Sequence, residues 1–277
     1  MSVQILVAIH NGSPIKASMA LATRWARRLD GSVIGLGVVD KSNWAPAPVL
    51  PSGDAPMNRP DNAVLARAAE RVKHSLQQLE EHCSQAGVEY SQVQDMGTAG
   101  EAILMEAQHH DVILLGKETT PDPGLGVPAR SVLESVLRHS PRPVVAVPNS
   151  VEDGQGILVA YDGSLQAARA LQALVASGLS PLDGIRVLSV DEKSEETAKE
   201  HAQRAVKYLA AHGIDAQSRP QVTDKSVEHV IMDEAQRQGV ELIVMGAYGR
   251  SRLAEFFLGS VTSRVLDESP LPMFLFH

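Results

Sequence analysis

The feature that most constrains this chain is an internal duplication. Three segment pairs resemble each other in the same order: ILVAIHNGS at 5–13 and ILVAYDGS at 157–164, DVILLG at 111–116 and ELIVMG at 241–246, SPRPVVAVP at 140–148 and SPLPMFLFH at 269–277. A repeat of about 130 to 150 residues has the size of a domain rather than of a solenoid unit. We therefore predict two domains of one fold, residues 1–150 and 151–277, with a boundary in the turn-rich stretch 149–156.

Each half alternates short apolar runs with longer amphipathic stretches. In the first half we expect strands at 5–9, 33–39, 88–93, 112–115 and 144–147, and helices at 14–29, 64–86, 100–109 and 130–137. In the second half we expect strands at 157–161, 185–190, 214–219, 242–245 and 272–276, and helices at 165–177, 195–212, 226–238 and 260–267. The alternation predicts an α/β protein of two tandem doubly wound domains, each a five-stranded parallel sheet with helices on both faces. Residues 42–62 contain five prolines, which favours a long irregular loop.

Composition excludes several classes of function. The net charge of −8 and the absence of Lys or Arg runs argue against a general nucleic-acid surface, and an aromatic content of 4% argues against base stacking. The single cysteine, Cys83, allows no intramolecular disulfide, and we expect a buried, unreactive thiol. No basic leader and no apolar stretch of membrane-spanning length is present, so we expect a cytoplasmic protein without a membrane partner.

Residues 243–266, IVMGAYGRSRLAEFFLGSVTSRVL, have the order that a phosphate site needs. A short strand leads to Gly246 and Gly249, and Gly259 and Ser260 then open a helix. Glycines permit positive φ and place no Cβ between an anion and the backbone N–H groups, while the first N–H groups of the helix can hold further oxygens. The alternative is that the glycines are ordinary turn residues and Ser260 is an N-cap. Spacing alone favours neither interpretation.

Asp162 directly follows the first strand of the second half. In a doubly wound sheet the ligand lies beyond the carboxyl ends of the strands, so Asp162 is expected at the same edge as Gly246. A carboxylate there could accept hydrogen bonds from ribose hydroxyls. The alternative is helix capping, for which Ser164 is the better candidate.

ILVAYDGS at 157–164, VLSVDE at 187–192 and the spacing G-x2-G-x9-G-S at 246–260 together resemble the universal stress protein family in its tandem two-domain form. The resemblance covers essentially the whole chain, and the glycine spacing is typical of the ATP-binding branch. It implies the strand order 3-2-1-4-5 in each domain and ATP, with or without Mg²⁺, in the second domain. By matching positions, Asp162 would meet the ribose and Ala160 and Val190 would line the adenine pocket. The residues implied for ribose and phosphate binding are Gly246, Gly249, Arg250, Gly259, Ser260 and Val261.

The family's ATP-binding members are usually sensors or regulators of stress responses with slow or no hydrolysis. We therefore expect an ATP-binding regulator, and no catalytic residue is assigned. One alternative is an ATP-dependent nucleotidyl or phosphoryl transferase, for which residues 250–258 offer only Glu255 as an acidic group. Another is a nucleotide-independent scaffold that engages an unknown protein partner through residues 42–62.

The first half departs from the ATP-binding pattern. His10 and Asn11 stand where Asp162 stands in the second half, and Arg130 stands opposite Gly259. An arginine there would place a long side chain where phosphate oxygens approach, so we expect a degenerate nucleotide motif. Lys117 and Arg130 could meet another anion, but a solvated or salt-bridged surface role is the stronger expectation.

The last strand of each half, at 144–147 and 273–276, is apolar and falls where an edge strand is expected. Exposed sheet edges are usually paired or covered. We predict that the halves meet there as an internal pseudo-dimer, in line with the family's habit of dimerising through this strand, and a homodimer of the whole chain is an open possibility. His109 and His110 are adjacent and point to different sides of a helix, so no metal site is expected.

Overall fold

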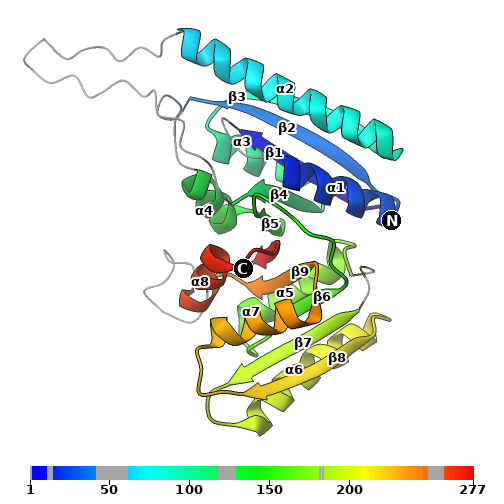
Figure 1. Ribbon diagram of the computed structural model, residues 1–277, viewed down its shortest axis with the longest axis vertical. Helices are drawn as coiled ribbons and strands as arrows, with labels where there is room; N and C mark the ends of the chain where they lie inside the picture. The colour runs from blue at the N-terminus through cyan, green and yellow to red at the C-terminus, as the bar shows by residue number, and fades with distance from the viewer. Residues whose placement is uncertain are drawn as a thin grey trace, which may run out of the picture.

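The computed structural model describes residues 2–10, 15–41, 62–117, 129–180, 182, 184–248 and 259–277, with the backbone alone at 62 and 129–131. These residues form an α/β protein built on one 10-stranded sheet with helices on both faces (Figure 1). The strand order is β3-β2-β1-β4-β5-β10-β9-β6-β7-β8.

The first half supplies the upper part of Figure 1. Its strands are β1 (Gln4–His10), β2 (Ser32–Asp40), β3 (Glu89–Gly97), β4 (Val112–Gly116) and β5 (Val144–Val147). Its helices are α1 (Lys16–Leu29), α2 (Asn62–Ala86), α3 (Ala99–Glu106), the short 3-10 helix η2 (Ala107–His109) and α4 (Ala129–His139).

The second half repeats this plan. Its strands are β6 (Ile157–Ala160), β7 (Ile185–Asp191), β8 (Ala216–Val222), β9 (Leu242–Gly246) and β10 (Met273–Phe276). Its helices are α5 (Leu165–Ala176), α6 (Glu195–Ala211), α7 (Val227–Gln238) and α8 (Ser260–Glu268).

The predicted order 3-2-1-4-5 is confirmed in each half, and the strands within each half are parallel. The strands that differ most from expectation are the two at the edges of the sheet. β3 ends at Gly97 rather than at 93, and β8 begins and ends later than the expected 214–219 and contains Pro220. Proline is tolerated because β8 lies at the edge of the sheet, where one side of the strand has no ladder to donate to.

The halves are joined through their last strands. β5 and β10 pair antiparallel, with Val145 opposite Phe274 and Ala146 opposite Met273. The predicted meeting of these strands is therefore present within the chain, and each covers an edge that the other half would expose. Self-association of the whole chain stays a prediction.

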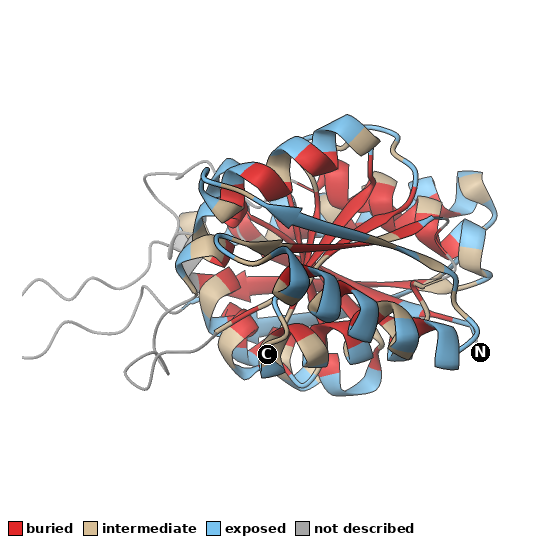
Figure 2. Cartoon of the chain, turned by 90° about the horizontal axis from the view of Figure 1, so that it is seen from below, coloured by how far each residue is buried: buried red, intermediate tan, exposed pale blue. Residues whose placement is uncertain are grey.

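The core lies on the two faces of the sheet and is continuous across the junction. One apolar cluster lies beneath α1, α2, α5 and α6, and includes Trp25 and Phe274 from opposite halves. The other lies beneath α3, α4, α7 and α8, and joins Leu133 to Leu266. Figure 2 shows buried central strands and exposed outer helix faces, and the edge strand β8 is mostly exposed. Burial on both faces explains the continuous apolar runs in the central strands.

A buried carboxylate also links the halves. Glu241, which precedes β9, is 3% exposed and accepts a hydrogen bond from the indole Nε1 of Trp25 in α1. The guanidinium groups of Arg24 and Arg28 lie 3.6 and 3.4 Å from its Oε2. A buried charge is tolerated when such partners replace water.

Cys83 is fully buried in α2, as predicted, and its Sγ lies 3.7 Å from the hydroxyl of Thr23. Burial raises the pKa of the Cys83 thiol, which disfavours the reactive thiolate. Within the described ranges, no helix has the length and apolar character that crossing a membrane requires.

Candidate functional site

The candidate site lies at the carboxyl ends of the central strands of the second half. β6 is flanked by β9 and β7, with Val159 opposite Val244 and Ala160 opposite Leu188. Ala160 ends β6, Gly246 ends β9, and Val190 lies one residue before the end of β7. The structure thus brings these three predicted residues to one edge of the sheet, and all three are partly exposed.

Asp162 lies at this edge, exposed, in the turn between β6 and α5. Its Oδ1 accepts a hydrogen bond from the Ser164 N–H at 2.9 Å, and no further hydrogen bond of Asp162 occurs among the described residues. Ser164 is the N-cap of α5, and its hydroxyl accepts from the Ala167 N–H at 3.2 Å. The predicted preference for Ser164 as the cap is confirmed, and the second carboxylate oxygen of the exposed Asp162 has no protein hydrogen-bond partner in the described part of the chain.

Gly246 corrects one expectation. The positive φ proposed for it is wrong, because Gly246 is an ordinary strand residue and the left-handed backbone falls on Tyr248, with a φ of 59°. Gly246 is needed for a different reason: a Cβ there would lie 2.6 Å from the backbone nitrogen of Ala167 in α5. Its counterpart Gly116 in the first half is also a glycine. Gly246 therefore serves helix packing whether or not a ligand binds.

The start of α8 supplies the free N–H groups of the site. Gly259, rather than Ser260, is the N-cap, and among the described residues, which leave out 249–258, no side chain caps this helix end. Ser260 is exposed and Val261 is partly exposed. The hydroxyl of Thr262 donates to the carbonyl oxygen of Gly246 at 3.0 Å, which ties the first turn of α8 to the end of β9. An uncapped helix start beside a strand end can receive an anion through its N–H groups and its dipole.

Nearby charges are mostly engaged in local contacts. Asp191 ends β7, and its Oδ1 accepts from the N–H groups of Lys193 and Ser194, both at 2.8 Å, which lowers the pKa of the carboxyl group. In α8, Arg264 donates to the carboxylate of Glu228 in α7, and this hydrogen bond lowers the pKa of Glu228. Arg264 is therefore committed to stabilising the α7–α8 contact.

The corresponding edge of the first half has different chemistry. His10 ends β1 and is 2% exposed. Burial lowers the pKa of His10 to about 4, although the nearby charge of Asp40 acts to raise it. α4 already begins at Ala129, so the backbone of Arg130 is helical where the aligned Gly259 is an N-cap.

Lys117 also corrects an expectation. The solvated surface role is wrong, since Lys117 is 6% exposed. Its Nζ donates to the carbonyl oxygen of Leu266 at 3.0 Å and to that of Ser269, at the carboxyl end of α8. A cation is favourable at that helix end because the last carbonyls carry negative partial charge.

Several expected features lie outside the described residues. These are Gly249, Arg250, Glu255 and the proline-rich residues 42–61. Among the residues that are described, no group of at least three His, Cys, Asp and Glu side chains could hold a metal ion. His110, considered above for a metal, instead lies 3.0 Å from the Glu106 carboxylate.

Sequence reasoning missed Tyr248 and Thr262. A hydroxyl two residues after the glycine-serine pair could have suggested Thr262, because a first-turn side chain can reach a neighbouring strand end. Tyr248 offered no such signal, because its partner Glu134 is 114 residues away.

The universal stress protein family model matches residues 1–148 and 155–277. The chain belongs to the universal stress protein family. The two matched segments agree with the duplication, so the family resemblance and the α/β fold are both confirmed.

Individual relatives support the same assignment. The chain is 27% identical over 168 residues to a universal stress protein of Synechocystis sp., a match that covers 60% of this chain and 58% of that protein. It is 32% identical over 134 residues to one of Thermus aquaticus, covering 43% of this chain and 96% of the relative, as expected for a single-domain relative. A solved universal stress protein of Archaeoglobus fulgidus is similar with a TM-score of 0.65 and 20% identity, covering 98% of this chain and 97% of that one.

Proposed function

We propose that this protein is an ATP-binding regulator of a stress response, with one nucleotide site in the second domain, residues 151–277. The observation that carries the proposal is the uncapped start of α8 at Gly259, tied to the end of β9 at the same sheet edge as Asp162. N–H groups suit phosphate oxygens, and a carboxylate with a free oxygen suits ribose hydroxyls.

The remaining roles are those that the family resemblance implies for these positions. Ala160 and Val190 would line the adenine pocket, and Gly246, Ser260 and Val261 would face the ribose and phosphates together with Gly249 and Arg250. ATP would bind with or without Mg²⁺. A universal stress protein family member of Arabidopsis thaliana has been solved with AMP bound, and that observation belongs to that protein.

The first domain, residues 1–150, is proposed to lack an equivalent site. A helical Arg130 backbone and a buried His10 replace the free N-cap and the exposed carboxylate of the second domain. Binding rather than turnover is the proposed role. The cytoplasmic location, the protein partner and the homodimer stay predictions.

The test is ATP binding by calorimetry, on protein purified without added nucleotide and checked by native mass spectrometry. Wild type should bind one ATP, and Gly259→Arg should abolish binding while the thermal unfolding temperature stays close to that of wild type. The substitution is not strained by the backbone, because Gly259 has φ −51° and ψ 145°. Gly246→Ala would be a poor probe, because its Cβ would collide with α5.

Gly97→Arg is the matched control. Gly97 ends β3 in the first half, and a Cβ there meets nothing within 4 Å. This variant should bind ATP like wild type. Absence of binding to wild type at millimolar ATP would overturn the proposed function.

A further inference from the structure

The residues that follow β9, here called the exit of β9 (residues 247–248), contact the first half of the molecule. Tyr248 has a φ of 59°, a left-handed conformation that a bulky side chain rarely adopts. Its hydroxyl donates to the carbonyl oxygen of Glu134 in α4 at 3.1 Å. Such a strained conformation persists only where the surroundings hold it. The contact with α4 is one such restraint.

Further contacts surround the Tyr248 ring. The guanidinium carbon of Arg138, also in α4, lies 5.9 Å from the ring centroid. The ring of His277, which follows β10, lies 5.9 Å away at an interplanar angle of 78°. Both are favourable aromatic geometries. Tyr248 is therefore held between α4 of the first half and the end of β10.

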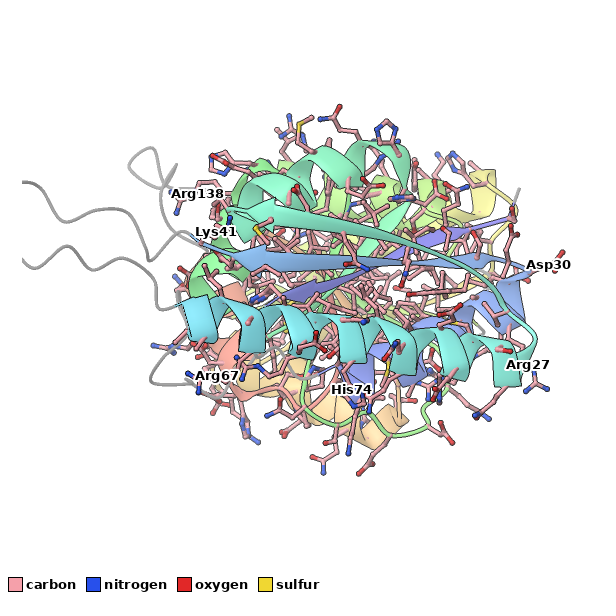
Figure 3. All side chains as sticks on the ribbon, turned by 90° about the horizontal axis from the view of Figure 1, so that it is seen from above. Arg27, Asp30, Lys41, Arg67, His74 and Arg138 are labelled. Atoms are coloured by element: carbon pink, nitrogen blue, oxygen red, sulfur yellow. The ribbon has the colours of Figure 1, made fainter. Side chains whose placement is uncertain are left out.

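These contacts lie at the ligand edge of the sheet. Figure 3 shows Arg138 at the same end of the molecule as Lys41, with Asp30 and Arg27 at the opposite end. Lys41 follows the carboxyl end of β2, so this is the end to which the parallel strands point their carboxyl termini. In Figure 1, α4 and α8 lie above and below the β5–β10 junction.

A reciprocal contact comes from the exit of β4. Lys117 follows Gly116 and donates to the last carbonyl oxygens of α8, as described above. The first half therefore contacts both the exit of β9 and the carboxyl end of α8. Within the second half these two elements are tied to each other by Thr262.

We propose that the first half is a positioning partner for the nucleotide site of the second half, with Tyr248 as the positioning residue that docks the exit of β9 on α4. This inference rests on the proposed function. The first half, which lacks the glycine pattern of the second, would thus contribute to the affinity of the second half for ATP. Tyr248 acts on the population of the binding-competent backbone at 246–248, and apparent affinity falls in proportion to that population.

The test is Tyr248→Phe, which removes the hydroxyl and keeps the ring. The expected result is a rise of about 2- to 12-fold in the Kd for ATP, the change that loss of one hydrogen bond of about 0.5–1.5 kcal/mol produces. Tyr90→Phe is the matched control, because the Tyr90 hydroxyl donates to a helix carbonyl oxygen of Leu76 at 3.3 Å within the first half. It should leave the Kd unchanged even if it lowers stability to a similar extent.

Hydrogen exchange without nucleotide separates this inference from the proposed function. Tyr248→Phe should speed amide exchange at 245–248 and in the first turn of α8, and Tyr90→Phe should not. If wild type binds no ATP, the proposed function fails, whereas the exchange rates still report the docking of Tyr248. If wild type binds ATP and Tyr248→Phe binds equally well, the positioning role is overturned alone.

Discussion

At the scale of single residues, the two halves differ most where β1 and β6 end. The first half buries His10 there, and the second half exposes Asp162 in the turn that follows β6. Burial disfavours the charged imidazole and lowers its pKa to about 4, although the neighbouring Asp40 acts in the opposite direction. One edge is thus closed by a neutral ring, and the other keeps a carboxylate oxygen accessible.

The buried imidazole predicts a pH dependence of stability. The pKa of His10 is about 4 in the folded protein against 6.5 for a free imidazole, so the unfolded chain takes up the proton first as the pH falls. The contribution of the neutral His10 to the free energy of unfolding is complete above pH 6.5. It is lost as the pH falls toward 4, at about 1.4 kcal/mol per pH unit. Urea unfolding at pH 7 and pH 5 should show a smaller loss in His10→Leu than in wild type. Equal losses in both proteins would contradict the assignment.

At the scale of elements, β10 is the strand that joins the second half to the first. It is a strand of 4 residues that pairs with β9 on one side and with β5 on the other. Phe274 lies fully buried at its centre, in the cluster that also contains Trp25. Its short length means that side-chain burial, rather than the number of ladder hydrogen bonds, must supply much of its stability.

Phe274→Ala is therefore expected to lower the free energy of unfolding by about 3–5 kcal/mol, the usual cost of emptying an aromatic site in a core. Phe276→Ala is the control, since Phe276 lies in the same strand but is partly exposed. Chemical denaturation should show the larger loss for Phe274→Ala. A similar loss for both variants would mean that β10 is not anchored through its buried centre.

At the scale of the whole molecule, the two halves share one sheet and one core despite the duplication. Both core clusters contain residues of both halves, and the sheet runs through the β5–β10 junction without interruption. Glu241 adds a buried polar link to Trp25, Arg24 and Arg28 at the end of the sheet remote from the candidate site. We therefore expect one cooperative unfolding transition rather than two.

Glu241→Ala tests this link, because it leaves the Trp25 N–H without its acceptor and removes the carboxylate beside Arg24 and Arg28, although Arg24 keeps its hydrogen bond to Asp153. Removing one partner of a buried charged pair costs about 3–5 kcal/mol, and the partial exposure of both arginines places the expected loss near the lower end. Glu241→Gln keeps an acceptor for Trp25 and should cost less. Chemical denaturation should show the free energy of unfolding falling from wild type to Glu241→Gln to Glu241→Ala. A second unfolding transition in wild type would contradict the expectation of one cooperative transition.

Local pattern determined much of this protein. Strand and helix periodicity depends on neighbouring residues, so the elements, their order and the duplication were predictable, and the apolar last strands predicted the β5–β10 pairing. The doubly wound pattern placed Asp162 and Gly246 at one sheet edge, and the structure agrees on that placement.

Only the tertiary structure decided which distant elements these strand ends contact. Gly246 is required by the approach of α5, Lys117 leaves the surface to cap α8, and Tyr248 docks on α4. The last two contacts join residues 149 and 114 positions apart. Periodicity reports which face of an element is buried. It carries no information on which distant element will cover that face, because that depends on the packing of the whole chain.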